Sequence, residues 1–365
     1  MSDAEKALGQ LRERIDAVDK GLLKLLNDRA ALAQEVAEAK RHGTASFYRP
    51  ERERSLIDSL QADNPGPFPG EAIRPVFQEI VSACLSLEQG MEVAYLGPEA
   101  TFTHQAVKRH FGSSAKTVPC GTIDAVFAEV ERGEAAFGVV PVENSSEGVV
   151  NHTLDCFVDS SLKIVAEIVV DIEHCLLARD GLKENQIERV YSHPQALAQC
   201  RGWLSANLKQ ASLVPSASTA DAARAAKEDP AGAAVSGQMA ARMYGLMVLR
   251  RNLQDHHDNV TRFLVVGKDS QAVGQADNLK TSLLMTLPDT PGALLEVLTH
   301  FERRAINLSK IESRPSKRKA WDYVFFLDLD GRADEAKVAE VLNILGERCD
   351  LFKVLGTYQK ADNHE

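Results

Sequence analysis

The chain has 365 residues and a mass of 39.9 kDa, which is too long for one ordinary core and predicts two or three domains. Hydrophobic residues at 44% and charged residues at 26% exclude a wholly disordered chain, and no apolar run approaches the roughly 18 residues of a membrane span. A net charge of −10 argues against generic nucleic-acid binding, and an N-terminus without an apolar stretch argues against secretion.

Residues 1–90 are predicted to form an all-helical domain. Apolar residues recur at steps of three and four from Leu8 to Ala39, which is the pattern of a coiled-coil seam and predicts one helix of about 35 residues. Shorter helices are expected at 50–62 and 71–89, separated by a turn rich in proline and glycine. Two short helices cannot bury so long a seam, so we expect a dimer in which the long helices pack together.

Charged residues interrupt this seam and its flank. Arg29 occupies a seam position, where a polar residue can specify register; because the nearby aspartates point off the seam, we favour a guanidinium that binds an anionic ligand. Arg12 and Lys40 lie on one flank, 28 residues and therefore about 42 Å apart. They can serve one site only if they come from different chains, and otherwise each is an ordinary solvated charge.

The segments L-R-E-R-I-D-A-V-D at 11–19, N-D-R-A-A-L-A at 27–33 and R-P-E-R-E-R at 49–54 resemble the all-helical chorismate mutase family, whose intertwined dimers use no cofactor. The resemblance implies a Claisen rearrangement of chorismate to prephenate. That reaction is helped by clamping two carboxylates and by positive charge on the ether oxygen, for which arginine and lysine are suited. The residues it implies are Arg29, Lys40 and Glu88 as catalytic groups, and Arg12 of the partner chain, Arg49, Arg52, Glu53 and Cys84 as substrate-binding groups. Glu88, Cys84 and Arg49 stand where relatives have glutamine, a small hydroxyl residue and an acidic residue.

Residues 91–270 are predicted to form a two-lobed α/β domain with parallel-rich sheets, because short apolar runs alternate with helical stretches. Two β-branched runs, 162–170 and 172–177, follow one another without a helix, as expected if the chain leaves one sheet, builds a second and returns. No G-x-G-x-x-G motif follows a strand, so a nicotinamide site is not expected. Polar residues follow two of the runs, at 143–146 and 192–195, where open α/β sheets bind ligands, although each alone is better explained as a cap or turn.

Five segments of this domain together resemble the prephenate dehydratase family: Y-L-G-P-E-A-T-F-T-H at 95–104, V-V-P-V-E-N-S-S-E-G at 139–148, Y-S-H-P-Q-A-L-A-Q-C at 191–200, S-T-A-D-A-A at 218–223 and N-V-T-R-F at 259–263. The resemblance implies conversion of prephenate to phenylpyruvate, carbon dioxide and water, with the departing hydroxyl protonated in a dry site. It implies Thr261, Glu143 and Ser192 as catalytic groups, and Asn144, Gln199, Thr101 and His193 as substrate-binding groups. A threonine hydroxyl is a weak acid, so we expect Thr261 to relay a proton from Glu143 or from His193, between which the sequence does not choose.

Two further residues of this domain bear on the site. Ala100 stands where the family has glycine, so it carries strain if the first loop requires a positive φ. Arg262 follows Thr261, and it either pairs with a substrate carboxylate or points outward.

Residues 279–360 follow a polar linker and are predicted to form a ferredoxin-like β-α-β-β-α-β domain. The segments D-T-P-G-A-L-L-E-V-L at 289–298 and N-L-S-K-I-E-S-R-P-S at 307–316 resemble the ACT regulatory domain. The first opens a helix, whose free N–H groups can hold a carboxylate. Alone it is explained by a helix start with apolar packing, but with both motifs present at the family's spacing we favour a ligand site. The resemblance implies that L-phenylalanine binds at an interface between ACT domains, at Gly292, Ala293, Leu294, Asn307, Glu312, Ser313 and Arg314.

The order of the three segments resembles the bifunctional P-proteins, which perform both reactions and are inhibited by phenylalanine. The six cysteines include no C-x-x-C pair, so we expect reduced thiols in a cytoplasmic homodimer or tetramer, with no metal, cofactor, nucleic-acid or membrane partner. A different class remains open, a non-enzymatic amino-acid-responsive binding protein, and so does an enzyme that keeps only one activity. The presence of Thr261, Glu143 and Ser192 favours the enzyme.

Overall fold

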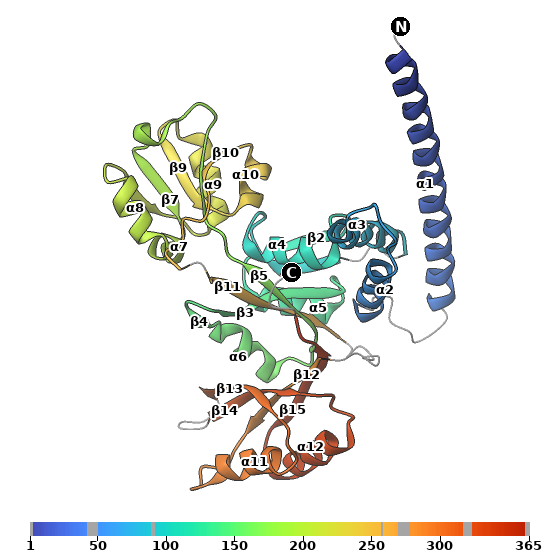
Figure 1. The fold of residues 1–365 in the computed structure, drawn as a ribbon. Coiled ribbons are helices and arrows are strands. Elements are labelled where there is room, and N and C mark those ends of the chain that lie inside the picture. The colour runs from blue at the N-terminus through green and yellow to red at the C-terminus, as the bar shows by residue number, and fades with distance from the viewer. Residues whose placement is uncertain are drawn as a thin grey trace. The chain divides into compact units, whose positions relative to one another are not determined.

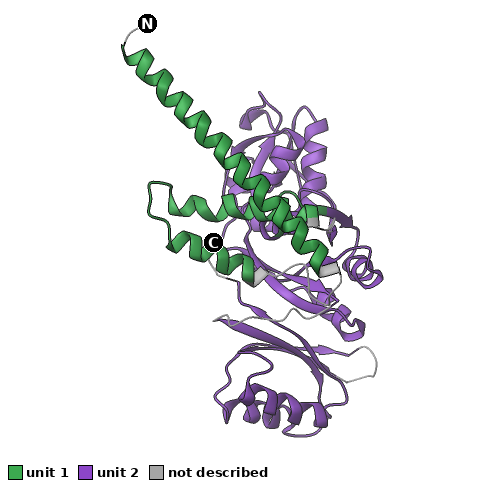
Figure 2. Cartoon of the chain, turned by 90° about the vertical axis from the view of Figure 1, so that its right-hand side faces the viewer, with its two compact units in different colours: residues 1–91, 111–116 green, residues 92–110, 117–365 purple. Residues whose placement is uncertain are grey.

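A computed structural model describes residues 3–41, 50–88, 92–256, 258–268, 278–316 and 323–361. The chain divides into two compact units (Figure 2), one of residues 1–91 and 111–116 and the other of residues 92–110 and 117–365. Within the described ranges, no helix is both long and apolar enough to cross a membrane.

The described residues of the first unit form the helices α1 (Asp3–Arg41), α2 (Pro50–Ala62) and α3 (Gly70–Glu88). No proline interrupts α1, which runs for 39 residues as the seam predicts, and α2 begins at its proline. Helix α3 packs against both others, and its small core includes Ala37, Ile57, Ile73, Val81 and Cys84.

The second unit begins with a lobe built on a mixed sheet (Figure 1) in the order β2-β1-β3-β11-β5, with the short β4 paired to β3. The strands of this lobe, lobe one, are β1 (Glu92–Leu96), β2 (Lys116–Cys120), β3 (Phe137–Asn144), β4 (Gly148–Val149), β5 (Lys163–Asp171) and β11 (Val260–Gly267). Its helices are α4 (Phe102–Phe111), α5 (Ile123–Arg132) and α6 (Asn151–Asp159).

Lobe two has a sheet in the order β10-β6-β9-β7-β8. Its strands are β6 (Cys175–Ala178), β7 (Arg189–Ser192), β8 (Ser212–Pro215), β9 (Gly232–Ser236) and β10 (Met247–Arg250). Its helices are α7 (Pro194–Gln199), α8 (Arg201–Asn207), α9 (Thr219–Glu228) and α10 (Gln238–Tyr244), with a 3₁₀ turn at Glu184–Gln186.

The two lobes confirm the predicted excursion of the chain, but their sheets are less parallel than expected. The chain leaves lobe one along β5 and returns along β11, and these two strands are neighbours that pair antiparallel. In lobe two the entering strand β6 and the departing strand β10 likewise pair antiparallel. Strands that carry a chain out and back side by side must run in opposite directions, so each sheet is mixed.

The C-terminal part of the second unit is the predicted β-α-β-β-α-β module. Its elements are β12 (Leu279–Thr286), α11 (Ala293–Glu302), β13 (Leu308–Pro315), β14 (Tyr323–Asp330), α12 (Ala336–Arg348) and β15 (Phe352–Gln359). The antiparallel sheet has the order β13-β14-β12-β15, and both helices cover one face (Figure 1). The other face shares a core with lobe one, and β15 approaches β5 so closely that a Cβ at Gly356 would lie 2.1 Å from the Ile164 carbonyl oxygen.

Candidate active and effector sites

Several residues expected in the mutase site lie on the three N-terminal helices. Helix α1 carries an exposed Arg12 and a half-buried Arg29, α2 carries Arg52 and Glu53, and α3 carries the buried Cys84. Among the residues that the structure describes, none forms an ion pair with Arg12, Arg29 or Arg52, so these three guanidiniums are available to an anionic ligand. The side chains of Lys40 and Glu88 and the whole of Arg49 lie outside what is described.

The apolar seam of α1 is exposed within the single chain. Eight of its large apolar side chains, and the neighbouring Leu23 and Leu26, keep between 40% and 65% of their surface accessible; the eight are Leu8, Leu11, Ile15, Val18, Leu22, Leu25, Leu32 and Val36. A contiguous stripe of this kind is typical of a protein–protein interface.

Two short connections join lobe one to lobe two, and they are hydrogen-bonded to each other. The β5–β6 connection contains His174, and the β10–β11 connection contains Leu253, Gln254 and Asn259. Leu253 N–H donates to the His174 carbonyl oxygen at 2.9 Å, and Ile172 N–H donates to the Asn259 carbonyl oxygen at 2.8 Å. Gln254 Oε1 accepts from His174 N–H at 3.0 Å. The paired connections form a hinge between the lobes.

Five polar side chains meet at this hinge, and we call them the hinge cluster: Asn144, His174, Gln199, Asn259 and Thr261. Asn144 Nδ2 donates to Thr261 Oγ1 and to Asn259 Oδ1, each at 2.8 Å. Asn144 Oδ1 accepts from the N–H groups of residues 146 and 147, which fixes the orientation of the amide. Asn259 Nδ2 donates in turn to Gln199 Oε1 at 3.1 Å.

The chemistry of the hinge cluster follows from these hydrogen bonds. Thr261 accepts from Asn144 and donates to no other described residue, so its O–H can donate to an oxygen of a bound ligand. Gln199 Oε1 accepts from His174 Nε2 at 2.8 Å, which places the ring proton on Nε2. Burial lowers the pKa of His174, against the opposing effect of the Gln199 hydrogen bond, and its Nδ1 is buried without a partner. The cluster is therefore neutral and largely buried, and it can donate a hydrogen bond from Thr261.

Three other expected residues of this site make local contacts. Ser192 Oγ is buried and donates to the Val235 carbonyl oxygen at 2.6 Å. His193 caps α7, and Thr101 Oγ1 donates to the Pro98 carbonyl oxygen at 2.9 Å just before α4. Within the described ranges, none of these three side chains is hydrogen-bonded to the hinge cluster.

Glu143 and Arg262 lie on the opposite face of the sheet from Asn144 and Thr261. In the antiparallel register of β3 and β11, Thr261 pairs with Asn144 and Arg262 pairs with Glu143, and successive side chains of a strand point to opposite faces. The structure thus brings Thr261 together with Asn144 and Gln199, but it does not bring Glu143 to them.

On this second face, lobe one and the C-terminal sheet share a set of ion pairs that is buried except for the partly exposed Glu143, and we call it the back-face cluster: Glu143, Glu167, Arg262, Lys280, Lys310 and Asp328. Arg262 contacts Asp328 Oδ2 at 2.9 Å and Glu167 Oε2 at 3.3 Å, and Lys280 Nζ contacts Glu167 Oε2 at 3.0 Å. Burial alone would raise the pKa of Asp328, but the charges of Arg262 and Lys280 outweigh it and the pKa is lowered. Arg262 therefore does not point outward into solvent, and its guanidinium pairs with carboxylates of the protein.

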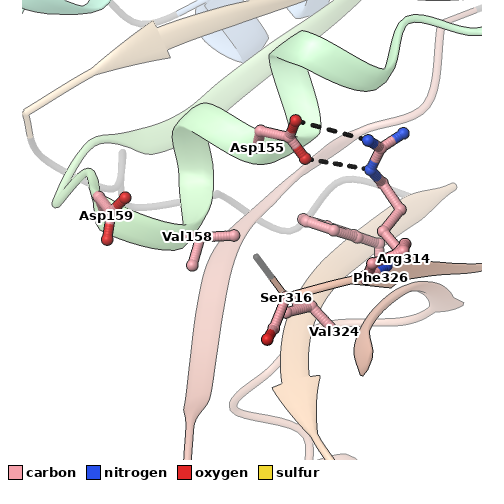
Figure 3. A pocket seen from close by; sticks show the side chains of 8 residues that line it. Asp155, Val158, Asp159, Arg314, Ser316, Val324 and Phe326 are labelled. Atoms are coloured by element: carbon pink, nitrogen blue, oxygen red, sulfur yellow. Dashed lines mark hydrogen bonds and ion pairs between the residues drawn. The ribbon is translucent and has the colours of Figure 1, made fainter. Parts of the chain in front are cut away.

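The two expected effector motifs line different pockets in one chain. Gly292 has a φ of 90° and caps α11, beside a pocket of about 480 Å³ that Ala293, Val297, Leu345 and Arg348 also line. The other motif lies on β13, where Arg314 contacts Asp155 of α6 through Nε at 3.0 Å and through a second nitrogen at 3.4 Å (Figure 3). Leu294, Glu312 and Ser313 lie beside these residues in α11 and β13, and Asn307 Nδ2 donates to Asp330.

The comparisons with known proteins agree with this three-part architecture. Family models match in order, chorismate mutase type II at residues 11–89, prephenate dehydratase at 93–271 and the ACT domain at 281–347. The bifunctional chorismate mutase/prephenate dehydratase of Aquifex aeolicus is 49% identical over 359 residues, which cover 97% of this chain and 98% of that relative. Its counterpart in Pseudomonas aeruginosa is 44% identical over 366 residues, covering 99% and 100%. The chain belongs to this bifunctional family.

A solved structure supports the fold of the larger part of the bifunctional enzyme. The crystal structure of prephenate dehydratase from Arthrobacter aurescens in complex with L-Phe is 37% identical, with a TM-score of 0.71, and covers 75% of this chain and 92% of that chain. The chain is thus an enzyme of phenylalanine biosynthesis, with a chorismate mutase, a prephenate dehydratase and an ACT domain in succession.

Sequence reasoning missed six residues of these two clusters: His174, Asn259, Glu167, Lys280, Lys310 and Asp328. Asn259 opens the N-V-T-R-F segment and Lys310 lies in the N-L-S-K-I-E-S-R-P-S segment, so those motifs contained the signal. The other four residues lie in no quoted motif, and their partners can be far away in the sequence: Arg262 and Asp328 are 66 residues apart.

Proposed function

We propose that residues 1–90 rearrange chorismate to prephenate, that residues 91–270 convert prephenate to phenylpyruvate, and that residues 279–360 bind L-phenylalanine and inhibit. The similarity to bifunctional relatives over nearly the whole chain supports this division. The observation that carries the dehydratase assignment is the hinge cluster, where a threonine hydroxyl is oriented by a buried amide.

For the mutase reaction, the chain needs to hold two carboxylates and to place positive charge on the ether oxygen. Arg29, Lys40 and Glu88 are the proposed catalytic groups, and the proposed binding groups are Arg12, Arg49, Arg52, Glu53 and Cys84. The exposed seam of α1 supports a homodimer, in which Arg12 of one chain reaches the site formed by Arg29 and Lys40 of the other. Arginine forks hold the carboxylates in the reactive conformer, and no proton transfer is required.

For the dehydratase reaction, we propose that Thr261 donates to the departing hydroxyl while Asn144 and Gln199 hold the substrate. The buried position of the cluster supports this role, because hydrogen bonds are stronger where water is excluded. The second-face position of Glu143 favours His193 over Glu143 as the source of the proton that Thr261 relays. Ser192 and Thr101 then support the site through their local contacts.

For regulation, the complex of the Arthrobacter relative with L-Phe supports phenylalanine as the effector. The proposed contacts are Gly292, Ala293 and Leu294 of one chain with Asn307, Glu312, Ser313 and Arg314 of another. Their separation into two pockets of one chain supports a site between ACT domains, in a dimer or a tetramer. The biosynthetic relatives and the free cysteines support a cytoplasmic enzyme.

One pair of assays tests this proposal on the full chain. Chorismate consumption and phenylpyruvate formation are measured separately, each with and without phenylalanine. We expect both reactions, with phenylpyruvate formation inhibited by phenylalanine. A chain that binds phenylalanine but turns over neither substrate would refute the enzymatic assignment.

A further inference from the structure

Strand β13 of the ACT domain holds lobe one through two cations. Alternate residues of β13 are half-buried, and among them Lys310 and Arg314 both reach carboxylates of lobe one. Lys310 Nζ lies 2.7 Å from Glu143 Oε2, and Arg314 forms its two contacts with Asp155 (Figure 3). The side chains of Lys310 and Arg314 are 14% and 13% exposed, whereas those of Glu143 and Asp155 are 39% and 22% exposed. Solvent therefore screens the Arg314 pair less than a surface pair, and it screens the Lys310 pair to an intermediate extent.

The carboxylate that Lys310 holds is next to the catalytic hydrogen bond. Glu143 precedes Asn144 on β3, and Arg262 follows Thr261 on β11, so the back-face cluster and the hinge cluster use adjacent residues of the same two strands. The pairing of β3 with β11 is irregular between Arg262 and Phe263. A β-bulge at such a position can change the direction in which the neighbouring side chains point. Contacts on one face of the strands therefore bear on the 2.8 Å hydrogen bond between Asn144 and Thr261 on the other face.

Glu143 also has a second cation within reach. Arg262 Nε lies 3.6 Å from Glu143 Oε2, and this nitrogen is buried without a hydrogen-bond partner. If Lys310 withdraws, the carboxylate can turn to Arg262 Nε and satisfy it, because a buried unpaired donor is costly. Two arrangements of Glu143 are thus available, and Lys310 selects one of them.

We propose that Lys310 is a positioning residue for dehydration, and that β13 is the element through which a ligand of the ACT domain changes the dehydratase site. The proposal rests on the dehydratase function proposed above. Glu312 and Ser313 lie on β13 between Lys310 and Arg314, so a ligand held at this motif displaces the strand that carries both cations. Movement of β13 releases Glu143 and disturbs the orientation of Asn144 and Thr261.

The test is a mutant cycle in the full chain, with prephenate as substrate. Lys310→Met keeps the length of the side chain and removes its charge; we expect kcat to fall by about tenfold or more, with KM changed by less than about twofold. Lys310→Arg should restore most of kcat, since a guanidinium can hold the same carboxylate. Because Lys310 acts through Glu143, Lys310→Met added to Glu143→Gln should cost nothing further. Inhibition by phenylalanine should weaken in Lys310→Met.

Lys353→Met is the matched control. Lys353 is also an ACT lysine that reaches lobe one, where its Nζ contacts the carbonyl oxygens of Val158 at 2.7 Å and Ser160 at 3.1 Å, away from Glu143. We expect this variant to retain kcat, and all variants to retain mutase activity. An unchanged kcat in Lys310→Met, an equal loss in Lys353→Met, or multiplicative effects with Glu143→Gln would overturn the proposal. A wild-type chain that forms no phenylpyruvate would instead refute the dehydratase assignment, and this proposal with it.

Discussion

Among the residues that the structure describes, two alanines have left-handed backbone conformations. Ala100 has a φ of 66° and Ala305 a φ of 51°, a region that costs a residue with a Cβ about 1–2 kcal/mol. The expected strain at Ala100 is therefore present. Its methyl group is buried in an apolar cluster of lobe two, among Cys175, Leu177 and Ala220, whereas Ala305 is exposed after α11. Burial of the methyl group offsets part of the strain at Ala100, and nothing offsets it at Ala305.

Replacement of each alanine by glycine should therefore have different effects. Ala305→Gly relieves the backbone strain of the folded state. The greater conformational entropy of the unfolded glycine variant costs only about 0.4–1 kcal/mol, so we expect the free energy of unfolding to rise by about 0.5–1 kcal/mol. Ala100→Gly also loses about 0.8 kcal/mol of methyl burial, so it should be close to neutral. Thermal unfolding of both variants checks this, and a destabilised Ala305→Gly would contradict it.

His174 makes the stability of the enzyme dependent on pH. Burial lowers its pKa from the ordinary 6.5, so the unfolded chain binds a proton at a higher pH than the folded chain does. The free energy of unfolding therefore falls as the pH drops below about 6.5, and this contribution is fully present above that pH. His174→Gln should flatten the dependence between pH 7 and 5, as measured by denaturant unfolding.

A second buried histidine provides the comparison for that measurement. Burial also lowers the pKa of His104, so its own contribution should remain in His174→Gln and disappear only in the double variant with His104→Gln. A slope in His174→Gln equal to that of the wild type would show that the pKa of His174 is the same in the folded and the unfolded chain.

Single residues were predictable where the backbone or a helical seam constrains them. Arg29 was singled out because it interrupts a periodic apolar pattern, and Ala100 because it stands where the family has glycine; the structure gives Ala100 a positive φ. Four members of the hinge cluster were predictable only as motif residues, and the fifth, His174, lies in no motif. The cluster's hydrogen bond between Asn144 and Asn259 spans 115 positions, and no local pattern records such a pair.

At the scale of elements, α1 was predicted well because a seam without proline determines both its length and its exposed face. The bounds of α2 follow from its proline, whereas the antiparallel pairing of β5 with β11 does not follow from their apolar composition. Strand composition reports burial, and direction depends on the path of the whole chain.

The length of α1 leads to a prediction about the proposed dimer. Arg12 and Lys40 lie about 42 Å apart on one straight helix, so a shared site takes them from different chains. Inactive Arg12→Ala and Lys40→Ala chains, mixed and refolded, should regain about a quarter of the wild-type mutase activity, because half the dimers are mixed and each has one intact site. Dehydratase activity should be unchanged throughout. No recovery despite verified heterodimers would place both residues in one chain's site.

At the scale of the whole molecule, the second unit joins two kinds of site through one pair of strands. Strands β3 and β11 contribute Asn144 and Thr261 to the hinge cluster on one face, and Glu143 and Arg262 to the back-face cluster on the other. The ACT sheet adds Lys280, Lys310 and Asp328 to the back-face cluster. The order of the domains was predictable from their motifs. That β3 and β11 contribute to both clusters was not predictable, because a motif identifies residues and does not show which face of the sheet each side chain occupies.

The last prediction concerns Gly292, which begins α11 with a φ of 90°. The proposed effector carboxylate lies against the N–H groups at this helix start, and a side chain at Gly292 would occupy the space that the ligand needs, since nothing else lies within 4 Å of its Cβ position. Gly292→Val should therefore keep dehydratase turnover and lose inhibition by phenylalanine, as measured by phenylpyruvate formation across a phenylalanine titration.

Backbone strain is a competing explanation for a loss of inhibition in Gly292→Val, and a substitution at Gly181 distinguishes strain from a blocked ligand site. It has a φ of 82° and an equally open Cβ position, but it lies in a loop of lobe two. Gly181→Val introduces the same strain away from the effector motif, so it should retain both turnover and inhibition. Loss of inhibition in both variants would assign the effect to strain. Inhibition that persists in Gly292→Val and is strictly competitive with prephenate would place phenylalanine in the dehydratase site, because only a ligand of that site is displaced completely by the substrate.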